Sequence, residues 1–536
     1  MMGNEPYVRE VTYMKDALMD VLDIFADERH FSLRLFFEGA ALGVLTGNVV
    51  AAFRWLLQTA DVMRPGFYVF LKENMAYALP FFAVLFIVGL LLWKIVKLEP
   101  MISGSGIPQV KGILLGEMHM RWAHVVLLKF IGGVLAIGVG GMSLGREGPS
   151  VQLGACVGQG IGRGLHRTRS EGRYLLTAGG GAGLAAAFNA PLAGVVFCLE
   201  ELQKNFSPLV LMAAITAAVT STAVTRMVFG GAPVFHLGEI PVIPMDGTYF
   251  LLVALGLFTG AVSMAFNPML RVSLDWYRAL PVRPWMKPVL PLMMSGMLGF
   301  FMPEVLGGGN LLVDSIVTAD YALPILLLLF AVKFTFLMVC FGSGVPGGIF
   351  LPMLVLGALC GAVFAKGAEA VGVMPAYYMT DCVAFAMAAY FAAVVKSPVT
   401  GSILIMEMTG SFEHMLAIIT VAMSAYMVTD MTGGQPVYDM LLARSLRIRD
   451  HIRKHMRRHR VAVELVAGAG SSVVRRRIGD IAFPKHVVLV NVRRGMSEHV
   501  PSPDFELIPG DYLYFLTDDT DVACLTAMVK ERIRDK

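Results

Sequence analysis

The stretch that decides the fold is GREGPSVQLGACVG, residues Gly145–Gly158, because the chain contains a second, diverged copy of it. The segment GIFLPMLVLGALCG (Gly348–Gly361) aligns with it at one constant offset, with identical Gly, Pro, Gly, Ala and Gly positions. A second block agrees after a short gap, since APLAGVVFCLE (Ala190–Glu200) and SPVTGSILIME (Ser397–Glu407) share a Pro, a Gly and a Glu. Internal similarity of this kind predicts two related halves, which we place at about 35–230 and 245–445.

The composition is that of an integral membrane protein. Of the 536 residues, 56% are hydrophobic and 16% are charged, whereas soluble domains carry roughly 25% charged residues. Many apolar runs approach the ~20 residues that a helix needs to cross a bilayer, and together they predict roughly ten or more membrane helices. These runs include Ala76–Val96, Val125–Val139, Leu209–Val228, Tyr249–Phe266, Leu323–Phe341 and Ser402–Val428.

Charge and hydrophobicity divide the chain into four predicted parts. We expect residues 1–34 to form an amphipathic cytoplasmic segment, since they lack the features of a cleaved signal peptide. Residues 35–446 are predicted to form the membrane domain, 447–460 a basic linker and 461–536 a soluble tail. Eight Lys and Arg residues lie in Arg444–Arg460, which favours a cytoplasmic position for the tail. For this basic run we favour contact with anionic lipid headgroups over nucleic-acid binding.

Three stretches of the tail cluster or alternate β-branched and aromatic residues between turn signals, which predicts strands. They are VAVELVAG (461–468), HVVLVNVRR (486–494) and DYLYFLTDD (511–519). The segment Asp521–Arg534 has helical spacing. We therefore expect a small cytoplasmic α+β domain of ordinary size.

Glycine and proline interrupt the apolar segments in a way that predicts helices beginning inside the membrane. Pro149 and Pro352 stand at first-turn positions, where a missing amide hydrogen costs nothing. GSGIPQV (Gly104–Val110) and FGSGVPGGIFLP (Phe341–Pro352) repeat this arrangement. Close helix packing explains one such motif well but three of them less well. The free amides of such helix starts attract anions, and matching broken helices in two halves are typical of transporters.

The repeat separates two classes of carboxylate in the apolar segments. Glu200 and Glu407 match across the halves, so we expect each to do the same structural work, such as bonding local amides. Glu147 and Glu201 instead fall opposite a Phe and a Met, so they are additions to one half. Because a carboxylate at membrane depth costs about 2.5–3.5 kcal/mol or more, these two are predicted to be functional.

Lys129 and Lys333 lie in apolar runs at roughly repeat-related positions. Two roles are open for these cations. Each could pair with a glutamate or with backbone carbonyls and so hold the fold, or each could raise the interior potential for anions.

Other chemistries are disfavoured. The six cysteines lie singly, with no CxxC and no metal-ligand spacing, so no disulfide frame, metal site or cofactor is indicated. The GxGxxA pattern in GGGAGLAAAFNAPLAG (Gly179–Gly194) has neither a preceding strand nor a ribose-binding acid, so we assign its small residues to helix packing. No HExxH, paired aspartates or serine dyad occurs in the apolar segments, which argues against an intramembrane enzyme.

In this order and spacing, GSGIP, GREGP and GGIFLP resemble the signature motifs of the CLC chloride channel and transporter family. APLAGVVFCLEE and GGQPVYDMLLAR resemble the family further, and the likeness covers about 35–446. The resemblance implies an all-α polytopic membrane protein with two inverted repeats and broken helices, assembled as a homodimer. It also implies that helix amino-termini hold chloride near the midplane, as the repeat had suggested.

The resemblance also implies roles for single residues. Ser105 and Tyr438 are similar to the hydroxyl donors to a central chloride, and Ile349 and Phe350 to its backbone amide donors. Glu147 resembles the gating glutamate, whose carboxylate competes with chloride for the outer anion site.

Glu201 resembles the inner proton-transfer glutamate of many chloride/proton exchangers. We therefore expect an antiporter of the plasma membrane with both termini in the cytoplasm. A passive chloride channel of the same family is the alternative. Ser105, in place of the proline of nitrate-preferring relatives, indicates chloride as the anion.

The tail resembles the carboxy-terminal RCK, or TrkA-C, module of bacterial potassium transport regulators. The resemblance rests on a VxV strand, a short helix at about Val473–Ile481, a second strand and the PGDYLYFL strand. Several such modules bind cyclic di-AMP, so the resemblance implies a regulatory nucleotide site. Candidate phosphate contacts are Arg475, Arg476, Arg477, Arg493 and Arg494. A tail that only stabilises a dimer, with solvated arginines, is the alternative.

Overall fold

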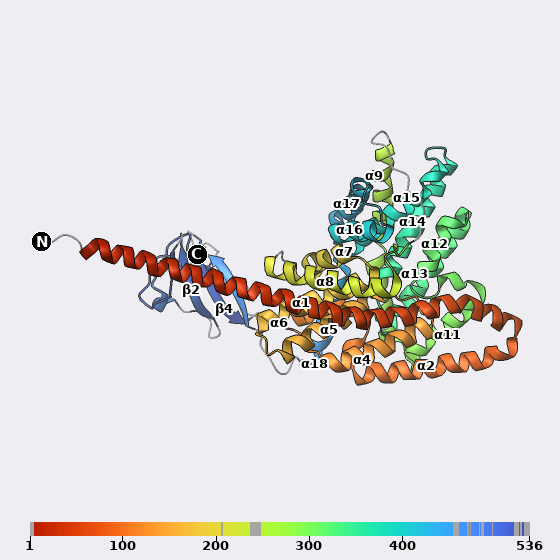
Figure 1. Ribbon diagram of the computed structural model, residues 1–536, viewed down its shortest axis with the longest axis horizontal. Coiled ribbons are helices and arrows are strands. Elements are labelled where there is room, and N and C mark those ends of the chain that lie inside the picture. The colour runs from red at the N-terminus through yellow and green to blue at the C-terminus, as the bar shows by residue number, and fades with distance from the viewer. Residues whose placement is uncertain are drawn as a thin grey trace, which may run out of the picture. The chain divides into compact units, whose positions relative to one another are not determined.

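The computed structural model describes residues 5–204, 207–235 and 248–453, and in the tail 460–468, 471, 473–481, 483, 487–495, 497–518, 525, 528 and 529. The chain forms two compact units, Met1–Arg444 and Ser445–Lys536, each of which is described by itself. The first unit is helical and the second contains the strands (Figure 1).

The helices of the first half of the membrane unit run from α1 to α8. They are α1 (Glu5–Glu73), α2 (Ala78–Leu98), α3 (Ile107–Leu114), α4 (Trp122–Gly133) with the π-helix η3 (Val134–Val139), α5 (Glu147–Gly164), α6 (Arg169–Phe188), α7 (Pro191–Phe197) with the π-helix η4 (Cys198–Gln203), and α8 (Pro208–Phe229). The helix α1 continues without a break through the predicted boundary at residue 34.

The helices of the second half run from α9 to α18. They are α9 (Thr248–Ser263), α10 (Phe266–Ala279), α11 (Met286–Phe301), α12 (Asn310–Thr318), α13 (Leu323–Gly342), α14 (Phe350–Ala370), α15 (Met379–Val395), α16 (Pro398–Thr409), α17 (Met415–Met431) and α18 (Val437–Arg453). The apolar run Ser402–Val428 is divided between two helices, because Gly410 takes a left-handed conformation (φ 71°) that ends α16 and separates it from α17.

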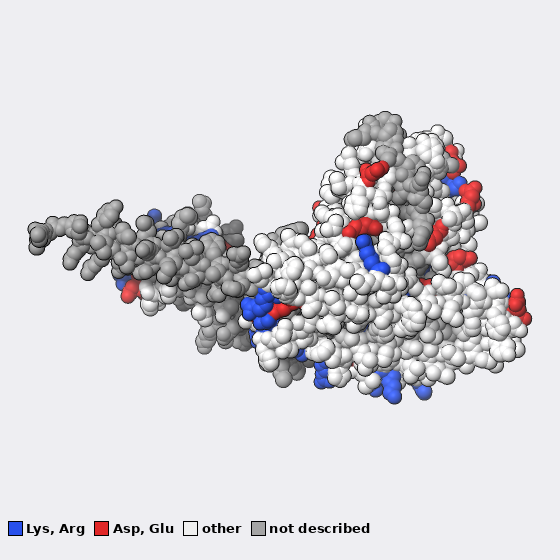
Figure 2. Space-filling view, in the orientation of Figure 1, with Lys and Arg blue, Asp and Glu red and all other residues white. Residues whose placement is uncertain are grey.

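Among the described residues, seven helices are long and apolar enough to cross a membrane, and three further apolar helices are shorter. Many large hydrophobic side chains on these helices are exposed, including Leu79, Phe250 and Phe301. Large parts of the face in Figure 2 accordingly carry no charged residue. An apolar outer surface of this extent is stable against lipid, so the chain is a multi-pass membrane protein.

The two halves repeat one another in structure. α5 and α14 begin at repeat-equivalent residues, Glu147 and Phe350, and the same offset relates the starts of α3 and α12. The left-handed glycines also match, since Gly104 and Gly106 (φ 65° and 99°) correspond to Gly307 and Gly309 (φ 61° and 101°). The counterpart of GSGIP is therefore GGGNL (307–311), which shares too few side chains with it to be found in the sequence.

Contacts between the halves are reciprocal, as a pseudo-two-fold axis requires. Gly145 and Gly348 exchange amide-to-carbonyl hydrogen bonds of 2.7 Å in both directions. Glu200 accepts from the Thr400 amide at 2.7 Å at the start of α16, while Glu407 accepts from the Ala193 amide at 2.8 Å at the start of α7. The matched glutamates are thus helix caps as predicted, but each caps a helix of the opposite half and not a local one.

The matched lysines also make equivalent contacts. Lys129 Nζ donates to the carbonyls of Ile102 and Gly104 at 2.8 and 2.6 Å. Lys333 Nζ donates to those of Val305 and Gly307 at 2.8 and 2.9 Å. Buried lysines therefore hold the backbone carbonyls at the turns before α3 and α12. Of the two roles that the sequence left open, this is the structural one.

Small residues allow the central helices to approach closely. A Cβ added at Gly179 in α6 would lie 2.2 Å from the Gly154 carbonyl oxygen in α5. A Cβ at Gly183 would lie 2.1 Å from the Ser150 carbonyl oxygen. The GGGAG segment thus packs against α5, as its small residues predicted.

The tail unit contains a four-stranded antiparallel sheet in the order β1-β4-β2-β3. β1 (Arg460–Val466), β2 (Val488–Arg494) and β4 (Tyr512–Asp518) fall on the three predicted strands, while the short β3 (Ser497–His499) was not predicted. The core of the tail unit includes the buried Leu465, Val492 and Phe515.

The helix predicted at Val473–Ile481 is wrong, since only a 3₁₀ turn forms at Ile478–Asp480. Arg475 has a left-handed backbone (φ 59°), and its amide donates to Leu507 and not to a helical neighbour. Of the helix predicted at Asp521–Arg534, most lies outside the described residues, and Leu525, Met528 and Val529 are helical.

Candidate ion pathway

Helix starts from both halves meet in the interior of the membrane unit. α5 begins at Glu147 and α14 at Phe350, and the hydrogen-bonded pair Gly145–Gly348 holds the two starts together. Pro149 and Pro352 each occupy the third position of their helix, within the first turn where no amide donor is needed. The free amides of these first turns make this junction suitable for an anion.

Two hydroxyl groups predicted to bind chloride are buried without a partner among the described residues. The Ser105 hydroxyl lies against the start of α5, because a Cβ added at Gly148 would come within 2.3 Å of it. Tyr438, the second residue of α18, is fully buried with an unpartnered hydroxyl. Buried hydroxyls without partners are costly, so each is available to an anion.

Ile349 and Phe350 occupy the cap and the first position of α14, and both are fully buried. The Phe350 ring packs among those of Phe188, Phe197 and Phe391, with centroid distances of 5.2, 6.2 and 4.5 Å. These rings fix the start of α14 from three other helices.

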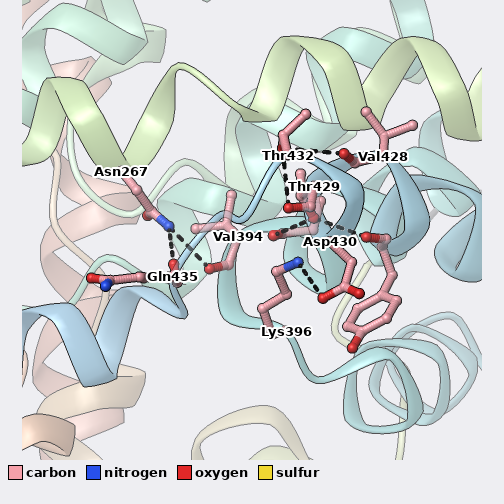
Figure 3. Close-up of polar contacts among 10 residues, drawn as sticks. Asn267, Val394, Lys396, Val428, Thr429, Asp430, Thr432 and Gln435 are labelled. Atoms are coloured by element: carbon pink, nitrogen blue, oxygen red, sulfur yellow. Dashed lines mark hydrogen bonds and ion pairs between the residues drawn. The ribbon is translucent and has the colours of Figure 1, made fainter. Parts of the chain in front are cut away.

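The segment before Tyr438 is fixed by polar contacts (Figure 3). The Asn267 side-chain amide donates to the Gln435 carbonyl at 2.8 Å and to the Val394 carbonyl at 3.4 Å. The Gly434 amide donates to the Thr429 carbonyl at 3.0 Å, which closes the turn after α17. The start of α18, and with it Tyr438, is thereby tied to α10, α15 and α17.

Glu147 is fully buried, and neither carboxylate oxygen has a hydrogen-bond partner among the described residues. A Cβ added at Gly145 would lie 2.4 Å from Glu147 Oε2 and 3.2 Å from the Leu351 amide nitrogen, so the carboxylate lies beside the start of α14. Arg146 Nε is 3.7 Å from Glu147 Oε1. The carboxylate therefore occupies the kind of place that the helix starts offer to an anion.

Glu201 lies in the π-helix η4 and is 2% exposed. Its carboxylate accepts from Lys111 Nζ at 2.7 Å and from the Ser397 hydroxyl at 3.1 Å. Lys111 also forms an ion pair with Asp439, which lies 2.5 Å from Lys204 Nζ. Glu201 thus ends a chain of alternating charges that leads to the partly exposed Asp439.

The structure brings Ser105, Glu147, Ile349 and Phe350 together around the helix starts, while Glu201 belongs to the separate ion-pair chain. Tyr438 precedes Asp439 of that chain at the start of α18. Sequence reasoning missed Lys111 and Asp439, although each lies close to a motif already singled out.

The five tail arginines fall into two groups. Arg494 forms two hydrogen bonds of 2.9 Å with the Asp511 carboxylate, and Arg493 lies 4.5 Å from the Tyr512 ring centroid. The side chains of Arg475, Arg476 and Arg477 are exposed on one segment. Burial raises the pKa of Asp511, but hydrogen bonds from Arg494 and the Ile508 amide outweigh it and bring the pKa below its ordinary value.

Comparisons with known proteins agree with this geometry. Residues 84–430 match the family described as "Voltage gated chloride channel", and residues 462–530 match the TrkA-C domain. The H(+)/Cl(-) exchange transporter ClcA of Salmonella schwarzengrund (strain CVM19633) is 35% identical over 439 residues, which cover 78% of this chain and 90% of that protein. The ClcA of Salmonella arizonae is similar to the same extent.

Solved structures show the same fold. A slow cyanobacterial Cl-/H+ antiporter superposes with a TM-score of 0.73 at 30% identity and covers 78% of this chain and 99% of its own. A CLC-type fluoride/proton antiporter shares the fold at a TM-score of 0.62 and 22% identity, over 74% of this chain and 95% of its own. The chain therefore belongs to the CLC family of chloride channels and transporters, and a TrkA-C domain follows its membrane domain.

Proposed function

We propose that the protein is a chloride/proton antiporter. The observation that carries the proposal is the buried carboxylate of Glu201, which the fold does not require because its repeat counterpart is Met408. An anion pathway alone gains nothing from a second negative group at this depth. The 35% identical relatives are described as exchange transporters, which supports the same conclusion.

In this proposal chloride binds where the helix starts meet. The hydroxyls of Ser105 and Tyr438 and the amides of Ile349 and Phe350 donate to the anion, which satisfies groups that are otherwise buried and unpartnered. Glu147 acts as the gate because its carboxylate is itself an anion at the helix starts. When Glu147 takes up a proton it loses that attraction and chloride replaces it.

Glu201 receives protons from the side of the membrane opposite to the one from which Glu147 takes them up. Lys111 and Ser397 orient its carboxylate, and the partly exposed Asp439 provides a polar route towards solvent. Proton exchange between Glu201 and Glu147 then alternates with chloride movement. A passive chloride channel of the same fold is the second candidate, because Glu147 alone is sufficient for gating.

Proton pumping separates the two candidates. Proteoliposomes containing the full chain are given an outward chloride gradient with no initial pH difference, and internal pH is followed. Chloride efflux must drive proton uptake until an opposing pH gradient forms. Chloride efflux without any proton movement would establish the channel and refute the exchanger.

Assembly and orientation are part of the proposal. The extensive apolar surface of the membrane unit fits lipid and a second copy of the chain, so we place the protein in the plasma membrane as a homodimer. The basic run Arg444–Arg460 supports a cytoplasmic tail, and the proposal also puts the amino terminus in the cytoplasm.

The tail is proposed to bind a small anionic regulator, with cyclic di-AMP as the first candidate. Arg475, Arg476 and Arg477 are exposed and can reach phosphate groups, although Arg477 Nη1 also lies 3.6 Å from the Asp504 carboxylate. Arg494 is already paired with Asp511. Calorimetric titration of cyclic di-AMP into the full chain should give saturable heat that the triple substitution of Arg475–Arg477 by Gln removes. Equal heats in the two proteins would leave the tail as a structural module.

A further inference from the structure

A cavity of about 450 Å³ lies on the membrane unit beside the turn that leads into α18. α10 forms one wall, and the ends of α15 and α17 with the segment before α18 form much of the rest. Its lining includes Met264, Asn267, Arg271, Val272, Thr432 and Gln435, and none of the described residues that line it is acidic. The volume is within the range of small-molecule sites, so it can take a lipid head group.

Most polar groups of this cavity are satisfied within the chain. The Ser263 hydroxyl donates to the Gly260 carbonyl at 2.7 Å. The Thr432 hydroxyl donates to the Thr429 carbonyl at 3.1 Å, as Figure 3 shows. The hydrogens of these hydroxyls therefore need no further partner.

Two polar side chains on the wall have no partner among the described residues. The guanidinium of Arg271 is exposed and forms no ion pair with them. The carboxylate one turn further along α10, Asp275, lies 2.7 Å from Arg444 instead. The side-chain amide of Gln435 is also exposed and lies outside the hydrogen-bond network of Figure 3. Asn267, one turn before Arg271, holds the Gln435 carbonyl at 2.8 Å, so a free cation and a free amide share this cavity.

The surface of α10 around the cavity is that of a helix in contact with lipid. Met269, Val272 and Trp276 are 48%, 58% and 52% exposed. Arg271 and Arg278 lie among them and are exposed as well. Exposed apolar residues together with tryptophan and arginine are typical of the boundary between acyl chains and head groups. The molecule most available to this cavity is therefore a phospholipid.

We propose that the cavity binds one phospholipid with an anionic, hydroxyl-bearing head group, of the phosphatidylglycerol type. Arg271 pairs with the phosphate, and the Gln435 amide bonds to the head-group hydroxyls. The acyl chains lie along Met264 and Val272. An ethanolamine head group would bring an ammonium beside Arg271, where the described lining has no acidic residue. A choline head group has no hydrogen to donate, so charge and hydrogen bonding both favour the glycerol head group.

Native mass spectrometry of the full chain, titrated in detergent with phosphatidylglycerol, measures the dissociation constant of each bound lipid. Arg271→Gln should raise that of the tightest lipid by roughly ten- to a hundredfold, the effect of losing hydrogen bonds to a charged group. Val272→Trp, which fills the cavity and keeps the arginine, should raise it as well. Arg278→Gln is the matched control, because it removes an exposed arginine of the same helix outside the cavity. It should bind the lipid as the wild type does.

The choice of lipid is tested on the wild type. Phosphatidylethanolamine and phosphatidylcholine should each bind about tenfold more weakly than phosphatidylglycerol at this site. Glycerol 1-phosphate, which has the head group without acyl chains, should not displace the bound lipid. This last comparison separates a lipid site from a site for free phosphate compounds.

Hydrogen exchange tests where the lipid binds. The amides of Gly433 and Gly434 donate at 3.0 Å to the carbonyls of Asp430 and Thr429, in the turn beside the cavity. Opening of this turn must release a lipid that is bound against it. With phosphatidylglycerol at ten times its dissociation constant, exchange at both amides should therefore slow about tenfold in the wild type. It should not slow in Arg271→Gln at the same lipid concentration.

Equal phosphatidylglycerol affinities in Arg271→Gln and Arg278→Gln would overturn the site. A wild type that binds phosphatidylcholine as tightly as phosphatidylglycerol would overturn it too, as would exchange at Gly433 and Gly434 that the lipid leaves unchanged. None of these measurements involves transport. A protein that binds the lipid in this way but moves no protons would contradict the proposed function and leave the lipid site intact.

Discussion

Lys111→Met tests the role assigned to the ion-pair chain at Glu201. Lys111 Nζ lies 2.7 Å from Glu201 Oε1, and the two side chains are 5% and 3% exposed. Removing one partner of a buried pair costs about 3–5 kcal/mol, because the remaining charge is left uncompensated. At 1.4 kcal/mol per factor of ten, the ionised form of Glu201 should become roughly 10²- to 10³-fold less favourable or more.

The expected result is a loss of proton coupling without a loss of chloride transport. In the proposed mechanism a Glu201 that remains neutral cannot release the protons it receives, whereas the helix starts proposed to bind chloride are untouched. Simultaneous recording of chloride and proton fluxes from proteoliposomes should therefore show a falling proton-to-chloride ratio in Lys111→Met.

Lys204→Met provides the matched control. Lys204 contacts the same aspartate, Asp439, but its side chain is 51% exposed. Exposed ion pairs contribute about 0–1 kcal/mol, so this variant should keep the wild-type ratio. A wild-type flux ratio in Lys111→Met, or equal losses in both variants, would refute the reasoning.

Three further predictions follow from the geometry. Glu200→Gln and Glu407→Gln should lower thermal stability by similar amounts, about 1.5–3 kcal/mol per lost charge-assisted bond, and a fluorimetric melt in which only one shifts would contradict the reciprocal caps. Ser105→Ala should weaken chloride binding about tenfold by calorimetry, and unchanged binding would exclude the hydroxyl as a ligand. Because the pKa of folded Asp511 lies below the ordinary value of about 3.9, its stabilisation is complete above that pH and is lost as the pH falls through the folded value. Hydrogen exchange of the β4 amides in the full chain, corrected for its intrinsic pH dependence, should accelerate in the wild type as the pH falls through the folded pKa of Asp511. It should not accelerate in Asp511→Asn.

The sequence predicted those features of the fold that leave a local trace. Apolar length, first-turn prolines and the repeat of GREGP in GGIFLP are such traces, and the helix starts at Glu147 and Phe350 follow from them. The matched glutamates were correctly predicted to be structural. Their partners were not, because a cap supplied by the opposite half depends on the three-dimensional arrangement of the halves.

The contacts around the glutamates show the same limit. Lys111 and Asp439 are 328 positions apart, so no local pattern joins them to Glu201. The prediction of a helix at Val473–Ile481 fails for a physical reason. Amides of this segment donate to the carbonyls of Leu507 and Phe505, and these hydrogen bonds replace those that a helix would make.

Glu201 is proposed to carry protons in exchange for chloride. The most direct measurement is the ratio of proton to chloride flux in proteoliposomes containing the wild type or Glu201→Gln, under the same chloride gradient. The claim predicts uphill proton movement in the wild type, and chloride flux without proton movement in the variant. An unchanged proton-to-chloride ratio in Glu201→Gln would contradict it. Chloride flux without uphill proton movement in the wild type would contradict it as well.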